Sequence, residues 1–135
     1  MRELEQYFKA LADSTRLRIL NLLLLGELCV CDVQYVLDIS QPNVSRHLAY
    51  LKNSGLVLDR RDGYRIFYRL AVPDRETKKL LYDFLRRSFL QQAQLKDDTA
   101  RLKEAVSAGA CTLSEWKPRI DVAAANLTSA TAPKR

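Results

Sequence analysis

The chain has 135 residues, of which 47% are hydrophobic and 28% charged, an ordinary balance for one soluble globular domain with a single core. The formal net charge of +6 and the isoelectric point of about 9.4 favour a polyanionic partner, most commonly nucleic acid. The chain opens without a signal-peptide pattern, and the apolar run from Leu22 to Leu25 is too short to span a bilayer. We therefore expect a cytoplasmic protein without a membrane or separate protein partner.

Two helices are predicted before Gly26. The first is indicated by apolar residues at helical spacing, namely Leu4, Tyr7, Phe8 and Leu11. Asp13 can cap a second helix from about Ser14 to Leu25, which carries leucines on one side and Arg16 and Arg18 on the other. One face of this helix should be buried. Gly26 is expected to end it in the left-handed conformation.

A helix-turn-helix is predicted next. The apolar residues Val33, Val36 and Leu37 indicate a helix within Glu27 to Leu37, and the polar turn Asp38-Ile39 follows. Ser40 can then cap a helix that extends to Leu51, in which Pro42 occupies the first turn, where a missing N–H costs nothing. The apolar seam of this helix consists of Val44, Leu48 and Leu51. The arrangement is typical of a DNA-binding motif.

The polar side of this helix carries side chains of the types that form hydrogen bonds with DNA bases. Amides pair with adenine, guanidinium groups with guanine, and hydroxyls with either. The candidate DNA-binding residues here are Ser40, Gln41, Asn43, Ser45, Arg46 and His47. An ordinary surface helix with a good N-cap would show the same local pattern. We interpret His47 as a structural or phosphate-contacting residue.

A β-hairpin is predicted after the stop signal Asn53-Ser54-Gly55. Its strands are Leu56 to Arg61 and Tyr64 to Leu70, joined by Asp62-Gly63 in a type I′ turn. Arginines crowd this hairpin at Arg60, Arg61, Arg65 and Arg69, and we take the first three as phosphate contacts. A solvated basic hairpin is the alternative. The predicted fold is therefore mainly α with a β-hairpin wing, a winged helix-turn-helix.

Helical spacing returns at Asp74, which is the predicted cap of one long terminal helix with an apolar stripe. Surplus aromatic residues in the first and last helices favour a homodimer through these helices, namely Tyr7, Phe8, Phe84 and Phe89. Residues 1–105 would form the DNA-binding and dimerisation domain. Residues 106–135 would form an extension that contains Cys111 and, after Pro118, a disordered tail.

Three cysteines, an odd number, do not make a disulfide framework. They are interpreted as thiols for packing, redox chemistry or metal binding. Cys29 and Cys31 are close in sequence, although residues two apart do not share a helix face, so they would converge at a frayed helix start. Trivalent arsenic prefers three sulfurs, and Cys111 can supply the third by folding back or crossing to another subunit. The alternatives are that Cys29 and Cys31 are small buried hydrophobic residues, that Cys111 is a free thiol without a function, or that the thiols form a redox sensor. No enzyme signature is present.

Three motifs resemble the ArsR/SmtB family of metal-sensing repressors, in its arsenic-sensing branch, over about residues 4–100. They are Leu11-Ala12-Asp13-Ser14-Thr15-Arg16-Leu17-Arg18-Ile19-Leu20, Glu27-Leu28-Cys29-Val30-Cys31-Asp32, and Ser40-Gln41-Pro42 with Ser45-Arg46-His47-Leu48. The resemblance implies a homodimeric winged-helix repressor that binds double-stranded operator DNA and releases it when an inducer binds cysteine thiolates. It implies no constitutive cofactor and As(III) or Sb(III) as inducer, with Cd(II) or Pb(II) in another branch.

The sequence departs from the family's patterns at the sensor site. The usual third cysteine of the arsenic branch is replaced by Gln34, the N-terminal cysteines of the cadmium-lead branch are absent, and His47 is the only histidine for a zinc-type site. The candidate metal ligands are therefore Cys29, Cys31 and Cys111. A cadmium- or lead-responsive repressor and a thiol redox-sensing repressor remain alternative functions.

Overall fold

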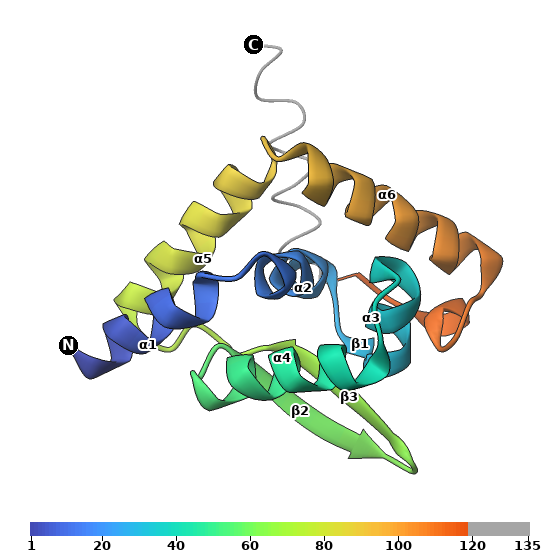
Figure 1. Ribbon diagram of the computed structural model, residues 1–135, viewed down its shortest axis with the longest axis horizontal. Helices are drawn as coiled ribbons and strands as arrows, with labels where there is room; N and C mark the ends of the chain where they lie inside the picture. The colour runs from blue at the N-terminus through green and yellow to red at the C-terminus, as the bar shows by residue number, and fades with distance from the viewer. Residues whose placement is uncertain (119–135) are drawn as a thin grey trace.

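The computed structural model describes residues 1–118 and shows a mainly helical fold with a small antiparallel sheet (Figure 1). Its elements are α1 (Arg2–Leu11), α2 (Ser14–Leu25), β1 (Leu28–Cys29), α3 (Val30–Leu37), α4 (Gln41–Asn53), β2 (Val57–Asp62), β3 (Arg65–Leu70), α5 (Glu76–Phe89), α6 (Ala93–Ala108) and the 3₁₀ turn η1 (Leu113–Glu115). The predicted winged helix-turn-helix is confirmed. None of the described helices is long and apolar enough to cross a membrane. The predicted disordered tail lies outside the described residues.

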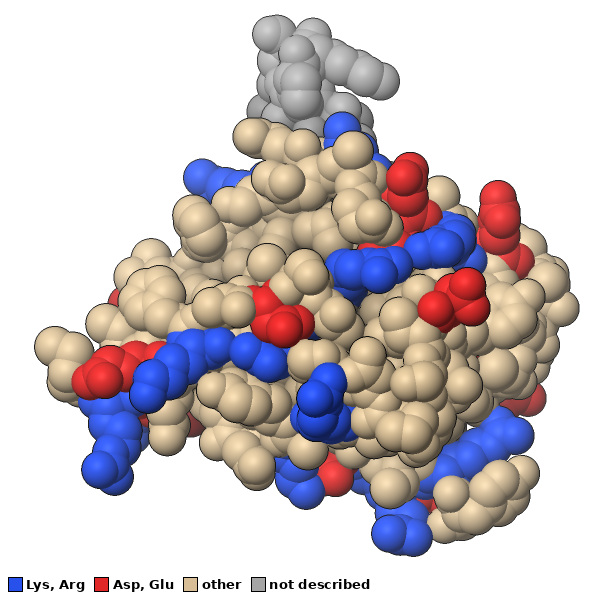
Figure 2. Space-filling view, viewed as in Figure 1, with Lys and Arg blue, Asp and Glu red and all other residues tan. Residues whose placement is uncertain are grey.

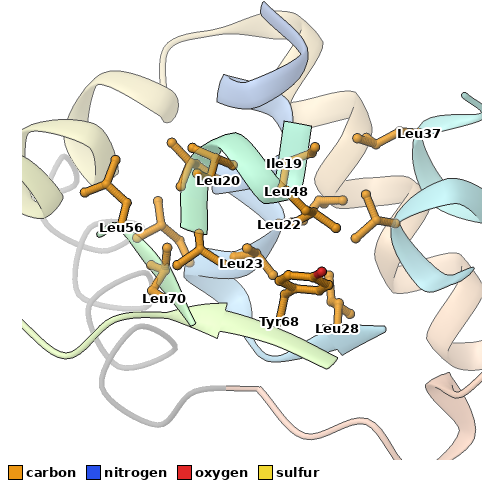
Figure 3. Close-up of a cluster of buried hydrophobic side chains, with 14 of the residues drawn as sticks. Ile19, Leu20, Leu22, Leu23, Leu28, Leu37, Leu48, Leu56, Tyr68 and Leu70 are labelled. Atoms are coloured by element: carbon orange, nitrogen blue, oxygen red, sulfur yellow. The ribbon is translucent and has the colours of Figure 1, made fainter. Parts of the chain in front are cut away.

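Helix α2 is the centre of the core. The side chains of Ile19, Leu20, Leu22 and Leu23 are fully buried, and Figure 3 shows them against side chains from α4 and the strands. The burial extends around more of α2 than the one predicted face, because α6 covers the side that carries Arg18.

The ends of the first helices follow the predicted caps only in part. The Asp13 carboxylate accepts a hydrogen bond from the backbone N–H of Arg16 at 3.1 Å, as predicted. Gly26, in contrast, has φ 169° and ψ 173°, so the left-handed cap is wrong and the chain runs extended towards β1. Ser40 occupies the N-cap position of α4, but its side chain makes no capping hydrogen bond.

The wing is part of a three-stranded sheet with the order β1-β3-β2. Strand β1 has two residues, too few to produce a sequence pattern, and pairs Cys29 with Phe67. Asp62 pairs with Arg65, so the hairpin loop is Gly63-Tyr64, one residue later than predicted. Of these two loop residues only Gly63 has a positive φ, of 66°, which fits a type II′ turn and makes the type I′ prediction wrong.

The single long terminal helix is replaced by α5 and α6. A tight turn closed by hydrogen bonds from the Gln91 and Gln92 N–H groups separates them, and the two helices diverge above α2 in Figure 1. The turn allows Leu95 and Leu102 of α6 to pack into the core. Helix α6 continues past residue 105, where the domain boundary was predicted, to Ala108.

The predicted aromatic dimer surface divides into core and surface residues. Tyr7 and Phe89 are buried, whereas Phe8 and Phe84 have 60% and 63% of their surface exposed. Leu80, one turn before Phe84, is also exposed. Of the four predicted aromatic residues, therefore, only Phe8 and Phe84 are exposed.

The first residues of α5 also differ from the prediction. Arg75 occupies the N-cap position, and Asp74 forms an ion pair with Lys78 at 3.5 Å. The Asp74 side chain therefore contacts a residue in the first turn of the helix and does not cap its N-terminus.

Candidate nucleic-acid interface and thiol site

Helices α3 and α4 form the two arms of the helix-turn-helix. Asp38, with φ 53°, ends α3 in the left-handed conformation, and Ile39 leads to α4. The seam residues Val44, Leu48 and Leu51 have no exposed surface. Burying this seam fixes the rotation of α4 and turns its polar residues outward.

The polar residues of α4 form two pairs on its surface. The Gln41 amide donates to the Ser45 hydroxyl at 2.8 Å, and the Arg46 guanidinium donates to the Asn43 side-chain oxygen. Gln41 and Arg46 are exposed, as is Ser40 at the start of the helix. The structure therefore brings five of the six predicted residues to one accessible surface.

His47 lies on the inner side of the same helix. It has 8% of its surface exposed, and its Nδ1 lies 3.3 Å from the Arg16 guanidinium and 3.9 Å from the Asp13 carboxylate. Burial lowers the pKa of His47, with the charge of Asp13 opposing that shift. These contacts match the structural interpretation of His47.

The wing arginines differ in their surroundings. The Arg60 guanidinium forms an ion pair with Glu27 at 2.7 Å and stacks over the Phe67 ring at 4.5 Å. Arg61 is exposed, and the half-buried Arg65 lies 5.5 Å from the Tyr64 ring. In Figure 2, basic side chains predominate along the lower edge, where Figure 1 places α4 and the hairpin.

Cys29 and Cys31 lie at the start of α3 but do not both belong to the helix. Cys29 ends β1 and is the N-cap of α3, with φ −78° and ψ 158°, and Cys31 lies in the first helical turn. The Cys29 thiol accepts from the backbone N–H of Asp32, whose carboxylate accepts from the Cys29 N–H at 2.8 Å. Because Cys29 ends a strand and Cys31 lies in the helix, regular helical spacing does not keep the two thiols on different faces.

Cys111 folds back to the start of α3 within the same chain. Its Sγ lies 3.5 Å from the carbonyl oxygen of Cys31, and the potential ligand atoms of Cys31, Asp32 and Cys111 lie within 4.8 Å of one another. Cys29 is outside this group. Burial, followed by the nearby Cys29 thiol and the charge of Asp32, raises the pKa of Cys31. The three thiols are all free of disulfides.

Comparison with known proteins identifies the family. Residues 13–58 match the family described as bacterial regulatory protein, arsR family. The arsenic resistance transcriptional regulator ArsR2 of Pseudomonas putida KT2440 is 43% identical over 98 residues, which cover 71% of this chain and 83% of that protein. This chain belongs to the ArsR family.

Another relative is the arsenical resistance operon repressor of Escherichia coli K12, which is 61% identical to the ArsR-family chain over 67 residues. The match covers 49% of this chain and 57% of the repressor, so it spans little more than half of the repressor's length. Members of the family are transcriptional regulators, and the ArsR-family chain is accordingly a regulator and not an enzyme.

Two solved structures share the fold of this ArsR-family protein. HlyU from Vibrio cholerae matches with a TM-score of 0.59 and 34% identity, covering 67% of this chain and 95% of that one. The homodimeric winged helix-turn-helix domain of Mb0332 from Mycobacterium bovis matches with a TM-score of 0.56 and 33% identity, over 67% and 83% of the two chains.

A cleft in the ArsR-family protein connects Cys29 and Cys31 with residues predicted to contact DNA. It has a volume of about 370 Å³, and its lining includes Cys29, Cys31, Gln41, Ser45 and Arg65. The start of α3, the start of α4 and the wing therefore enclose one space. A group bound to the thiols from this side would lie next to residues predicted to contact DNA.

Sequence reasoning missed two residues that organise these sites. Arg16 donates to the Ala10 carbonyl at 2.7 Å and lies over the Tyr50 ring at 4.1 Å, which connects α1, α2 and α4. Asp32 connects Cys29 with Thr112. Arg16 gave no signal beyond its place in a helical pattern. An acidic residue three positions after Cys29, the capping-box position, was the available signal for Asp32.

Proposed function

We propose that this ArsR-family regulator is a homodimeric repressor that binds operator DNA through α4 and the wing. Trivalent arsenic or antimony, bound by Cys29, Cys31 and Cys111, releases it. The observation that carries the proposal is the position of Cys111 beside Cys31 in the first turn of α3, with Cys29 at the N-cap of the same helix. The names of the two arsenic-resistance relatives support this class of inducer.

The chemistry of the inducer fits neutral thiols. Arsenous acid, As(OH)₃, exchanges its three As–O bonds for three As–S bonds, and each thiol proton leaves with a hydroxyl group as water. Arsenic stays trivalent, so no oxidant or reductant is required. Three soft sulfur donors match the pyramidal coordination of a trivalent arsenical.

Inducer binding at the start of α3 can change the position of α4, because the two helices are close in the sequence and in contact. Only Asp38, Ile39 and Ser40 separate the two helices, and α3 and α4 also pack against each other. Drawing the thiols of Cys29, Cys31 and Cys111 together would shift the first turn of α3 and the orientation of α4. A coupling of about 1–3 kcal/mol is typical of such linked sites and lowers DNA affinity by roughly 5- to 150-fold.

The proposed dimer uses the exposed apolar residues of α1 and α5. Phe8, Leu80 and Phe84 lie outside the groups that surround the thiols, so the dimer should persist when the inducer binds. The homodimeric state of the Mycobacterium bovis domain supports this arrangement. A two-fold dimer would place two α4 helices on a palindromic operator.

The proposal is tested with a fluorescent duplex that the protein itself selects from a random-sequence library. Arsenite, antimonite, cadmium, lead and zinc are titrated separately into the reduced complex, and anisotropy reports release. We expect arsenite and antimonite to release the DNA at the lowest concentrations. Cys29→Ser and Cys31→Ser should bind DNA normally but resist release, and Cys111→Ser should require more arsenite.

Each alternative has its own result in this experiment. Release by cadmium or lead at lower concentrations than by arsenite would establish a divalent-metal repressor and contradict the arsenic proposal. Release by peroxide without added metal, with a disulfide seen by mass spectrometry, would establish a redox sensor. The proximity of Cys31 and Cys111 makes that pair the one to examine.

A further inference from the structure

We infer that Asp32 is a positioning residue of the thiol site: its carboxylate anchors residues 109–117, here called the strap, and so holds Cys111 as third ligand within the same chain. The inference rests on the proposed function for the role of the thiols. It adds that the ligand set depends on a carboxylate that binds no inducer and on a hydroxyl from the strap.

The Asp32 carboxylate is completely buried, and both of its oxygens are occupied. One oxygen accepts from the Thr112 N–H at 3.0 Å, and the other accepts from the Thr112 hydroxyl and from the Cys29 N–H at 2.8 Å. A buried carboxylate requires such donors, and here they come from the Cys29 peptide and from Thr112, with the Cys31 thiol as a further donor at 3.8 Å. Although Asp32 lies within ligand distance of Cys31 and Cys111, its oxygens already serve as acceptors.

A second anchor holds the strap beyond Cys111. Leu113 is completely buried, and the Trp116 indole N–H donates to the Glu27 carbonyl at 3.0 Å. The indole packs against Gly26 so closely that a Cβ at that position would lie 2.6 Å from it. The strap is therefore held at two places that follow its exposed thiol in the chain.

The conformation of Cys111 is consistent with a residue held by its surroundings. Its φ of 49° lies in the left-handed region, which a cysteine seldom adopts. Such conformations persist where neighbouring contacts determine them, and the adjacent Thr112 supplies both of its donors to Asp32. The contact with Asp32 thus sets the direction of the Cys111 side chain towards Cys31.

The test compares Thr112→Val with Thr112→Ser, which restores the hydroxyl, and with Ser114→Ala, an exposed strap residue. Arsenite affinity is measured on the reduced full-length protein, and X-ray absorption counts the sulfurs bound to arsenic. We expect three sulfurs in the wild type, Thr112→Ser and Ser114→Ala. Thr112→Val should bind arsenite about tenfold more weakly through two sulfurs and leave Cys111 open to alkylation, because outer-shell partners typically control affinity by 10- to 100-fold. DNA affinity without arsenite should stay within about twofold.

The outcomes separate this inference from the proposed function. Three sulfurs with unchanged affinity in Thr112→Val would overturn the positioning role of the Asp32–Thr112 contact. Two sulfurs in the wild type would overturn the role of Cys111 as third ligand while leaving arsenite-induced release intact. Arsenite bound by three sulfurs without release of DNA would overturn the proposed function and leave the inference standing.

Discussion

The guanidinium of Arg60 lies 2.7 Å from the carboxylate of Glu27, which ties strand β2 of the wing to the residue that precedes β1. The same guanidinium stacks on Phe67, so two contacts hold its position. Arg61 follows it in the strand and is exposed, and its side chain makes no hydrogen bond or ion pair to another described residue. The two neighbouring arginines should therefore contribute differently to DNA binding.

Arg61→Ala should weaken binding to all DNA sequences alike. Loss of one phosphate contact reduces the slope of log K against log salt by about one unit. Arg60→Ala should change that slope less, because Glu27 already compensates its charge in the free protein. Binding measured at several salt concentrations checks this difference. A larger slope change for Arg60→Ala than for Arg61→Ala would show that Arg60 leaves Glu27 to contact phosphate.

Arg46→Ala should act on specificity instead. Arg46 is exposed on α4, and its contact with Asn43 keeps the guanidinium on that surface. Loss of a bidentate base contact should cost about 1–3 kcal/mol on the selected duplex and little on random DNA. Competition between the two duplexes measures the ratio, with Arg61→Ala as the control. An unchanged operator preference in Arg46→Ala would exclude α4 as the reading helix in the orientation described here.

Much of the fold could be predicted because its patterns are local. The predicted seam of α4 consists of residues three or four positions apart, and all three of them are buried. Burial in β3 is less regular, because only Tyr68 and Leu70 are buried there. The break between α5 and α6 could not be predicted, since the apolar stripe continues across Gln91 and Gln92. Only packing of α6 on α2 decides where the chain turns.

The parts of the site that could be predicted are those that depend on residue type alone. The exposed polar residues of α4 and the return of Cys111 to the start of α3 agree with the sequence analysis. The burial of His47 and the pairing of Arg60 depend on partners distant in sequence, Asp13 and Glu27, and no local pattern encodes them.

Phe84→Glu should convert the dimer into a monomer. Phe84 is 63% exposed and lies one turn from the equally exposed Leu80, so a carboxylate there would be buried without a partner in the proposed interface. Tyr35→Glu, at an exposed aromatic residue on α3, is the control. Sedimentation at micromolar concentration should show a dimer for the wild type with and without arsenite. A monomeric wild type, or dissociation caused by arsenite, would contradict the proposed assembly.

The buried Asp98 should make the docking of α6 sensitive to acid. Its carboxylate accepts from Arg18 at 2.8 Å and from Arg101 at 2.8 Å, and it has no exposed surface. Burial alone would raise the pKa of Asp98, but the hydrogen bonds from Arg18 and Arg101 outweigh burial and lower it. A carboxyl whose pKa is lower in the folded state stabilises the fold above its unfolded pKa of about 3.9. That stabilisation is lost as the pH falls through the folded pKa.

Asp98→Asn should therefore lower the free energy of unfolding by about 3 kcal/mol at neutral pH, because Arg18 loses its charged partner in a largely buried place. The difference from the wild type should shrink as the pH falls below the unfolded pKa and through the lower folded pKa, where the wild-type carboxyl also becomes neutral. Urea unfolding at pH 7, 5 and 3 measures both free energies, and Asp97→Asn, at the exposed neighbouring residue, is the matched control. An equal loss for Asp98→Asn at pH 7 and pH 3 would show that the shape of the side chain, and not its charge, holds α6 against α2.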